Sequence, residues 1–482
     1  MVRELNIDLN RESGRSTYRR LAAAIRRAIH KGTLFPGDLL PSTRSLGETL
    51  GIHRHTVTAA LQELVAEGWL EPIARKGYRV CTVLPTVFTR AQRTPLFAPT
   101  QRLSITLKKQ LTIDGTFPDR GFRFAFQSGK PDLRIFPIDD FRRQLAECLK
   151  KGKTETLDYT DPAGFPPLVK EIGDYLRRVR GVKDRAIIVT HGSQEAIFII
   201  AQLLLSPGDC VGVEGLGYPP AWQALRAAGA QLIPLAIDEE GLVPAALEEA
   251  VQRHNLRLLY TTALHQYPTT ATMPVTRRSE IYSIAHRHKL PILEDDYDHE
   301  FHFRSHPLAP LAASDPAGIV LYVSTFSKVL FPAARIGFLA IPPDLKEPFR
   351  HFKRIQSRQN ETLVQAALAR WMRSGAFERH LRKMRRVYKD RRDTLIDCIH
   401  SIGSPLSVSI PDGGMAVWMD CERSSDRIAK AAAEKDVFVA PESRFHPEGR
   451  TGTHLRLGFA NQTESEIRAG MKIFQEVLGA ER

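Results

Sequence analysis

The first 81 residues alternate short apolar stripes with turns rich in glycine and proline. Residues 17–30 place their apolar side chains three and four positions apart, and Gly32 follows directly after this stripe. Apolar residues at this spacing lie on one face of a helix, and glycine commonly ends one. The pattern therefore predicts an amphipathic helix that begins near Thr17 and ends before Gly32.

Two further helices and a hairpin are expected next. Ser42 suits the N-cap of a short helix that Gly51 closes, and a third helix is expected over residues 54–67. The segments WLEPI and GYRVCTV are short and rich in β-forming residues, and the turn between them favours a two-stranded hairpin. Three helices followed by a two-stranded wing are typical of a winged helix-turn-helix.

The charges of this first part favour a nucleic-acid partner. The chain carries a formal net charge of +14, and residues 1–120 hold 19 Lys and Arg against 10 Asp and Glu. Such an excess indicates a polyanionic partner, although a basic solvated surface gives the same count. In a winged helix-turn-helix, the second helix of the pair enters the major groove by its N-terminal end. The side chains expected to contact DNA are therefore Arg54, His55 and Thr56 at that end, Arg44 on the preceding helix and Lys76 at the wing tip.

Beyond residue 120, short apolar runs alternate with helical patterns. The runs AIIVT, CVGVEG, LRLLYTTAL, LPILEDDYD and IVLYVSTFS are typical of buried strands. Strands that alternate with helices predict an α/β domain, in which a mostly parallel sheet is covered on both faces. Ligands usually bind at the carboxyl ends of such strands. Residues 83–120 hold four prolines and show weak periodicity, which favours a linker.

Composition limits the class of protein. Hydrophobic residues make up 43% of the chain, and the longest apolar run, residues 196–205, is about half the length that a membrane span needs. The N-terminus shows no apolar signal core. The five cysteines are scattered and form no CxxC pair, which disfavours a zinc site or a disulfide framework. We therefore expect a cytoplasmic protein with reduced thiols and no bound metal.

Reactive and charged groups follow three of the expected strands. Lys328 comes after IVLYVST among small hydroxyls and apolar residues, and Arg335 follows seven positions later. The turn HGSQEA opens a helix after AIIVT, and two carboxylates, Asp295 and Asp296, follow LPIL. Burial lowers the pKa of a lysine and makes it a better amine nucleophile. Backbone N–H groups at a helix start and an arginine side chain both suit a phosphate.

A lysine, a carboxylate, a phosphate-binding turn and an arginine are together the parts of a pyridoxal 5'-phosphate (PLP) site. The lysine bonds the aldehyde of the cofactor, and the carboxylate holds the proton on the pyridine nitrogen. Each residue alone is more often an ordinary surface or core residue. Their combination therefore carries the prediction of a PLP site centred on Lys328.

Motifs along the whole chain resemble a known family of regulators. The stretch LFPGDLLPSTRSLGETLGIHRHTVTAALQELVAEGWLEPIARKGYRV resembles the DNA-binding domain of the GntR family, although its wing keeps only Gly77 of the usual GxGT. Residues 121–482 resemble fold-type I aminotransferases, and the motifs are YTDPAGFPPL, GSQEA, GYP, HQYPT, EDDYDHEF, TFSKVLFPAARIGF and LRLGFA. The chain thus resembles the MocR subgroup of the GntR regulators. This implies a DNA-binding domain over residues 1–82, a linker over 83–120 and a PLP-binding effector and dimerisation domain over 121–482.

The resemblance implies roles for residues around the cofactor ring. Lys328 would carry PLP as an internal aldimine. Asp295 would pair with the pyridine nitrogen, but the adjacent Asp296 is not separated from it by the sequence. Tyr297 would bond the ring hydroxyl, and Tyr218 would stack on the ring.

Further roles follow for the phosphate and for the ligand. The residues expected to hold the phosphate are Ser193, Gln194, Thr325 and Arg335. Tyr159 would reach the phosphate of the neighbouring subunit, which implies a homodimer, and Arg456 would bind the carboxylate of an amino-acid ligand. The sequence departs from the usual family pattern on the ligand side, at Ala263, Leu264, Thr270 and Ala416. The identity of the effector is therefore left open by the motifs.

Three functions fit these features. In the favoured one, the protein is a regulator that binds operator DNA, and a small amine or amino acid displaces Lys328 from PLP and changes the arrangement of the DNA-binding heads. In the second, it is a working aminotransferase with a DNA-binding head. In the third, the aminotransferase-like domain only dimerises. The intact cofactor residues disfavour the third function and the fused head disfavours the second, although Lys328 is compatible with slow half-transamination.

Overall fold

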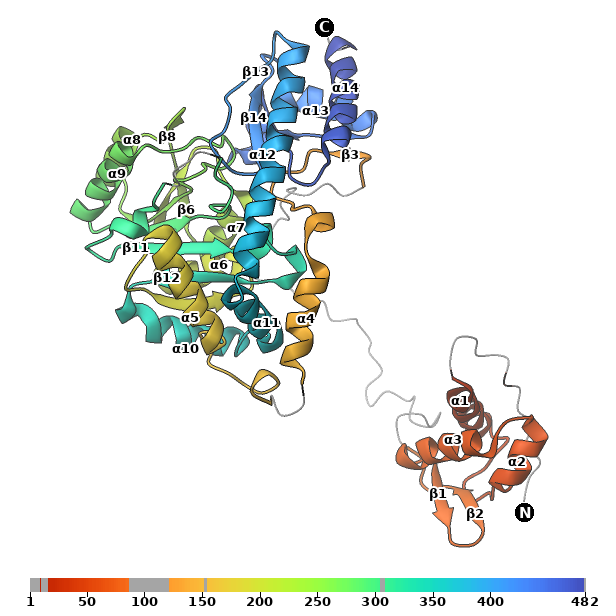
Figure 1. Ribbon diagram of the computed structural model, residues 1–482. Coiled ribbons are helices and arrows are strands. Elements are labelled where there is room, and N and C mark those ends of the chain that lie inside the picture. The colour runs from red at the N-terminus through yellow and green to blue at the C-terminus, as the bar shows by residue number, and fades with distance from the viewer. Residues whose placement is uncertain (1–8, 10–15, 86–120, 151–153, 304–307, 481–482) are drawn as a thin grey trace, which may run out of the picture. The chain divides into compact units, whose positions relative to one another are not determined.

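The chain divides into two compact units, residues 1–109 and 110–482, each with its own hydrophobic core. The computed structural model describes residues 9, 16–85, 121–150, 154–303 and 308–480 (Figure 1). The linker expected over residues 83–120 falls almost wholly outside the described residues. The domain boundaries given above therefore stay a prediction.

The first unit is the winged helix-turn-helix that the sequence predicts. Its elements are α1 (Thr17–His30), α2 (Thr43–Leu50), α3 (Arg54–Ala66), β1 (Leu70–Ile73) and β2 (Gly77–Val80), and the two strands pair antiparallel. The hydroxyl of Ser42 accepts a hydrogen bond from the backbone N–H of Ser45 at 3.1 Å, and Gly51 ends α2 with a left-handed φ of 63°. Leu21 and Ile25 of α1 are fully buried against Val57 of α3. Helix caps and one small hydrophobic core thus stabilise the fold of this unit.

The second unit is built on a seven-stranded sheet. In spatial order its strands are β4 (Ala186–Thr190), β12 (Gly337–Ile341), β11 (Val320–Thr325), β10 (Ile292–Asp295), β9 (Leu256–Thr261), β5 (Cys210–Glu214) and β6 (Gln231–Leu235). Only β12 runs antiparallel to its neighbours, so the α/β prediction is confirmed. A short hairpin of β7 (Ile237–Asp238) and β8 (Gly241–Leu242) follows β6.

Helices cover both faces of this sheet because its strands are apolar on both sides. In β10, Ile292 belongs to one core and Leu293 to the other. The first face packs against residues of α5 (Pro166–Tyr175), α8 (Pro244–Arg253), α9 (Val275–Arg287) and α11 (Thr362–Arg373). The second face packs against residues of α6 (Ser193–Leu204), α7 (Pro219–Ala227) and α10 (Lys346–Ser357). A parallel sheet buried in this way leaves the carboxyl ends of its strands for ligands.

A smaller sheet completes the second unit. Its antiparallel strands are β13 (Ser407–Val408), β14 (Ala416–Asp420), β17 (His454–Gly458) and β16 (Ala440–Pro441), accompanied by α13 (Ser425–Glu434), α14 (Glu464–Ala480) and the pair β3 (Phe124–Ala125) and β15 (Val437–Phe438). Figure 1 shows the long helix α12 (Ala376–Ile402) running from the large sheet to this smaller part, and α4 (Ile138–Cys148) packs beside α11. Across the described ranges, no helix is both long and apolar enough to cross a membrane.

Candidate cofactor and effector site

A cavity in the second unit brings together residues that lie far apart in the sequence. It is lined by residues from both ends of the unit, among them Ser193, Tyr218, Asp295, Tyr297, Lys328 and Arg456. Asp295 ends β10, and Lys328 follows β11 in a short 3₁₀ turn. Because these strands are parallel neighbours, their carboxyl ends meet at one edge of the sheet.

Lys328 presents its amine to this cavity. Its Nζ donates a hydrogen bond to the backbone carbonyl of Gly129 at 2.9 Å. Desolvation lowers the pKa of Lys328, and the positive charges of Arg456 and Arg335 act in the same direction, while Asp298 and Asp295 oppose them. A lysine with a lowered pKa has a larger share of free amine and is therefore a better nucleophile.

Asp295 and Asp296 face opposite sides of the chain. Asp295 lines the cavity, where its Oδ2 accepts a hydrogen bond from the hydroxyl of Tyr260 at 3.0 Å and its Oδ1 has no partner among the described residues. Burial raises the pKa of Asp295 to about 7. Such a carboxylate fits a group that can supply both a positive charge and a hydrogen-bond donor.

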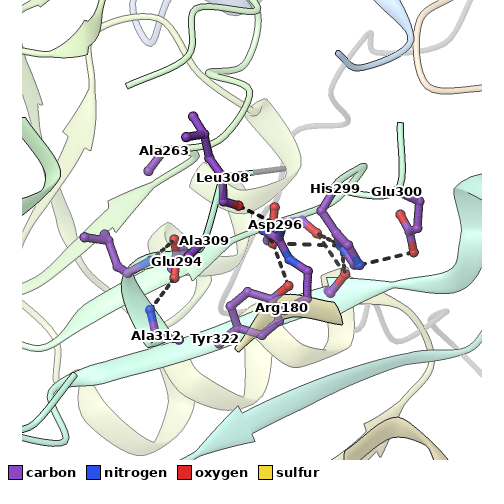
Figure 2. Close-up of polar contacts among 12 residues, drawn as sticks. Arg180, Ala263, Glu294, Asp296, His299, Glu300, Leu308, Ala309, Ala312 and Tyr322 are labelled. Atoms are coloured by element: carbon purple, nitrogen blue, oxygen red, sulfur yellow. Dashed lines mark hydrogen bonds and ion pairs between the residues drawn. The ribbon is translucent and has the colours of Figure 1, made fainter. Parts of the chain in front are cut away.

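Asp296 is instead part of a buried ion pair outside the cavity lining. Its Oδ2 accepts hydrogen bonds from Arg180 at 2.7 Å and from the hydroxyl of Tyr322 at 2.6 Å (Figure 2). Burial opposes ionisation of this carboxyl, but Arg180 and its neighbours hold the pKa of Asp296 below its ordinary value. Figure 2 also shows Glu294 accepting the backbone N–H group of Ala312, at 3.0 Å. The two adjacent carboxylates, which the sequence could not tell apart, therefore have different surroundings in the structure.

Aromatic side chains and an arginine form the ligand side of the cavity. Arg456 is 1% exposed, lies 4.3 Å over the ring of Tyr267 and donates to the carbonyl of Pro268. Tyr218 meets the ring of Tyr267 edge-on at 5.3 Å, and the hydroxyl of Tyr297 donates to the carbonyl of His265 at 3.2 Å. The arrangement places one buried positive charge in a largely aromatic wall.

The turn between β4 and α6 lies next to Arg335. Arg335 has a left-handed φ of 48° and donates to the carbonyl of His191, and a Cβ on Gly192 would come within 3.3 Å of its guanidinium. Gln194 donates its amide to the carbonyl of Pro220 at 2.8 Å. The hydroxyl of Thr325 caps the N–H group of Ser327 at 3.1 Å. Of the four residues expected at the phosphate, only Ser193 lines the cavity itself.

Tyr159 lies on the surface of the chain, away from the cavity lining. Its side chain is 72% exposed, and the guanidinium of Arg358 sits 4.5 Å over its ring. A side chain in this position is available to a neighbouring molecule.

The expected DNA-contacting residues are all on the surface of the first unit. Arg54 and His55 are exposed at the start of α3, where the ring of His55 stacks on that of His53 at 5.2 Å, and Thr56 beside them is partly exposed. Arg44 on α2 pairs with Glu48 at 3.0 Å, and Lys76 is exposed in the turn between β1 and β2. Each side chain is accessible to a partner.

Comparison with known families agrees with this two-part architecture. A family model described as bacterial regulatory proteins, gntR family, matches residues 17–80, and one described as aminotransferase class I and II matches residues 126–474. The probable rhizopine catabolism regulatory protein MocR of Rhizobium meliloti is 33% identical over 476 residues, which cover 96% of this chain and 94% of that protein. This chain belongs to the MocR-type regulators of the GntR family.

Other relatives support both halves of the assignment. The pyridoxine biosynthesis transcriptional regulator PdxR of Corynebacterium glutamicum is 30% identical over 472 residues, which cover 97% of each chain. The second unit resembles the kynurenine aminotransferase of Pyrococcus horikoshii, solved in complex with PMP, with a TM-score of 0.71 and 28% identity over 75% of this chain and 92% of that one. The relatives that span both domains are thus named as regulators, and the solved aminotransferase matches the second unit alone.

Sequence reasoning missed Tyr260 and Asp298, which the fold brings to the cavity. The hydroxyl of Tyr260 donates a hydrogen bond to Asp295, and Asp298 is hydrogen-bonded to His265 at 2.7 Å. The motifs EDDYDHEF and HQYPT contain Asp298 and His265, but their pairing depends on two loops meeting in space. Thr270, at a position where the family usually has glycine, adopts a left-handed φ of 64°. Glycine adopts this left-handed conformation readily, whereas a β-branched residue rarely does.

Proposed function

We propose that this protein is a DNA-binding transcriptional regulator that holds PLP at Lys328 and responds to a small amine or amino acid. The effector takes the place of Lys328 at the aldehyde carbon of the cofactor. Bound PLP supplies an electrophilic carbon at which one primary amine can replace another. The observation that carries the proposal is the meeting of the Lys328 amine with the unpartnered Oδ1 of buried Asp295 in one cavity.

Each residue has a proposed part in this site. Asp295 pairs with the pyridine nitrogen, because it lines the cavity and has one oxygen without a partner, while Asp296 is already paired with Arg180. Tyr297 bonds the ring hydroxyl and Tyr218 stacks on the ring. The proposed phosphate-binding residues are Ser193, Gln194, Thr325 and Arg335, around the N-terminus of α6.

The ligand and the partner molecules follow from the same geometry. Arg456 binds the carboxylate of an amino-acid effector, since it is a buried charge in the wall of the cavity. The exposure of Tyr159 supports a homodimer in which it reaches the neighbouring site. Operator DNA is contacted by Arg44, Arg54, His55, Thr56 and Lys76, all on the surface of the first unit.

A working aminotransferase is the second candidate function. It is favoured by the family match over residues 126–474 and by the nucleophilic setting of Lys328. Sustained turnover of an amino acid with a keto acid would support it, whereas a single half-reaction would leave the regulator proposal intact. The effect of amines on operator binding separates the two functions.

The first experiment is an absorption spectrum of the purified full-length protein, repeated after borohydride. A band near the visible edge that borohydride removes in wild type, and that Lys328→Ala lacks, is expected. Lys130→Ala is the matched control, because Lys130 is an exposed lysine close to the cavity residue Gly129 in sequence. A protein that stays colourless with added PLP, or a band that Lys328→Ala retains, contradicts the proposal.

A further inference from the structure

Asp298 is a buried carboxylate in the cavity wall that the proposed cofactor set does not use. It is 2% exposed, and its Oδ1 accepts a hydrogen bond from Nδ1 of His265 at 2.7 Å. The Oδ2 of Asp298 has no hydrogen-bond partner among the described residues. A buried carboxylate oxygen without a partner is costly, and a cation in the cavity would relieve that cost.

The chain around this pair is fitted closely to it. A Cβ on Gly413 would lie 2.4 Å from Nε2 of His265, and one on Gly414 would lie 3.1 Å from Oδ2 of Asp298. A side chain at Gly413 would collide with the ring of His265, and one at Gly414 would crowd the carboxylate of Asp298. The surroundings therefore hold the carboxylate in one position in the wall of the cavity.

Asp298 lines the same cavity as the amine of Lys328. Two carboxylates, Asp298 and Asp295, raise the pKa of Lys328 against the effects of desolvation, Arg456 and Arg335, and Asp298 is the stronger of the two. An effector amine must arrive beside Lys328 in order to replace it. Since Asp295 is assigned to the cofactor ring, Asp298 is the carboxylate left to receive a positive charge at this place.

We propose that Asp298, positioned by His265, binds the ammonium group of the arriving effector. The cavity then selects zwitterionic primary amines, with the ammonium at Asp298 and the carboxylate at Arg456 on the same cavity wall. This inference rests on the proposed function, because it requires an effector that exchanges with Lys328. It adds a second charged contact that specifies the class of effector.

Two small acids of equal length test this contact on the full-length, PLP-loaded protein. β-Alanine carries an ammonium group at neutral pH, whereas aminooxyacetate, with oxygen in place of one methylene, presents an uncharged amine. The rate of the spectral change after mixing is measured for wild type and for Asp298→Asn. The variant is expected to slow the reaction of β-alanine by about tenfold or more, and that of aminooxyacetate by less than about threefold.

Glu300→Gln is the matched control. Glu300 is a buried carboxyl two residues further on, also with an unpartnered oxygen, and it is absent from the cavity lining. Both rates are expected to stay near those of wild type. Asp298→Ser serves as a second neutral variant if Asp298→Asn does not fold.

A second measurement uses the cofactor-free protein. The labelling of Lys328 by acetic anhydride is followed against pH, and Asp298→Asn is expected to move its midpoint down by about one pH unit, because a negative charge that favours the ammonium form is removed. A variant that only disturbs packing would not produce this shift together with the difference between the two probes.

The outcomes separate the two proposals. If Asp298→Asn slows both probes equally, or does not slow β-alanine relative to wild type, the role of Asp298 is overturned. The proposed function still stands in that case, provided that wild type shows the band that borohydride removes. Absence of that band in wild type overturns the proposed function itself. A selective loss for β-alanine, absent in Glu300→Gln, supports the ammonium contact.

Discussion

Replacing Asp296 by asparagine removes the negative charge from a buried ion pair. Asp296 and Arg180 are 2.7 Å apart, and the side chain of each is 2% exposed. In the variant, the guanidinium keeps the carbonyl of Leu308 as a partner at 2.9 Å but loses its counter-charge. Breaking a buried pair by removing one partner costs about 3–5 kcal/mol, because the remaining charge stays desolvated. We expect the free energy of unfolding of the second unit to fall by about this amount.

The measurement is urea unfolding of the cofactor-free full chain, following the transition of the second unit. Asp174→Asn is the control, because Asp174 pairs with Lys170 at 2.6 Å but its side chain is 39% exposed. An exposed pair of this kind contributes about 0–1 kcal/mol, so the control should lose little. The two variants make the same chemical change and differ in burial.

The double variant Arg180→Met, Asp296→Asn gives the sharper test of the reasoning. Replacing the guanidinium by an apolar side chain removes the stranded charge, so the double variant should recover part of the loss of Asp296→Asn. A loss below about 1 kcal/mol in Asp296→Asn, or a double variant less stable than the single one, would refute the account. In either case Arg180 would not depend on Asp296 for its charge balance.

Three other predictions concern the cofactor site and the DNA-binding unit. Burial raises the pKa of Asp295 to about 7, so the folded cofactor-free protein binds a proton there that the unfolded chain has lost, and this contribution to stability declines as pH rises from about 4 to about 7. The free energy of unfolding of Asp295→Asn, relative to that of wild type, should therefore rise by about 2 kcal/mol between pH 5 and pH 7.5. A difference between the two proteins that does not change with pH contradicts this. Arg54→Ala should weaken binding to a specific operator by about 1–3 kcal/mol and make the protein less selective for that sequence, while Lys76→Ala should weaken binding to specific and random DNA alike. Titration of both variants with each DNA measures these losses. Equal losses of affinity for the two DNAs in Arg54→Ala would mean that Arg54 contacts only phosphate. A Cβ on Gly337 would lie 2.6 Å from the backbone of the turn before α6, so Gly337→Ala should cost about 1–3 kcal/mol in urea unfolding and weaken PLP binding, whereas Gly173→Ala, with its nearest contact at 4.0 Å, should do neither.

Local signals in the sequence were sufficient for the first unit. The N-cap at Ser42 and the left-handed glycine at Gly51 act within a few residues, and the structure has both where the pattern predicts them. The apolar stripe of residues 17–30 likewise becomes α1, with Leu21 and Ile25 buried. Such features depend on hydrogen bonds and side-chain spacing along one short segment, so they can be read without knowing the rest of the fold.

The candidate site was predicted in part. The motifs indicated Lys328 and a nearby carboxylate, and the fold places Lys328 and Asp295 in one cavity. Strand alternation implies that Asp295 and Asp296 face opposite ways, but it does not say which of them meets the cavity. That choice depends on Arg180, which lies 116 residues before Asp296 and pairs with it only in the folded chain.

The sequence by itself determined the two architectures, the order of the motifs and the kinds of reactive group that this protein carries. The tertiary structure decided which groups meet: Asp295 with the amine of Lys328 across one cavity, and Asp298 with His265 across 33 residues. Secondary structure follows from short-range periodicity and caps, whereas a binding site requires loops from several strands to converge. The burial that raises the pKa of Asp295 and lowers that of Lys328 exists only after this convergence, because desolvation is a property of the packed chain.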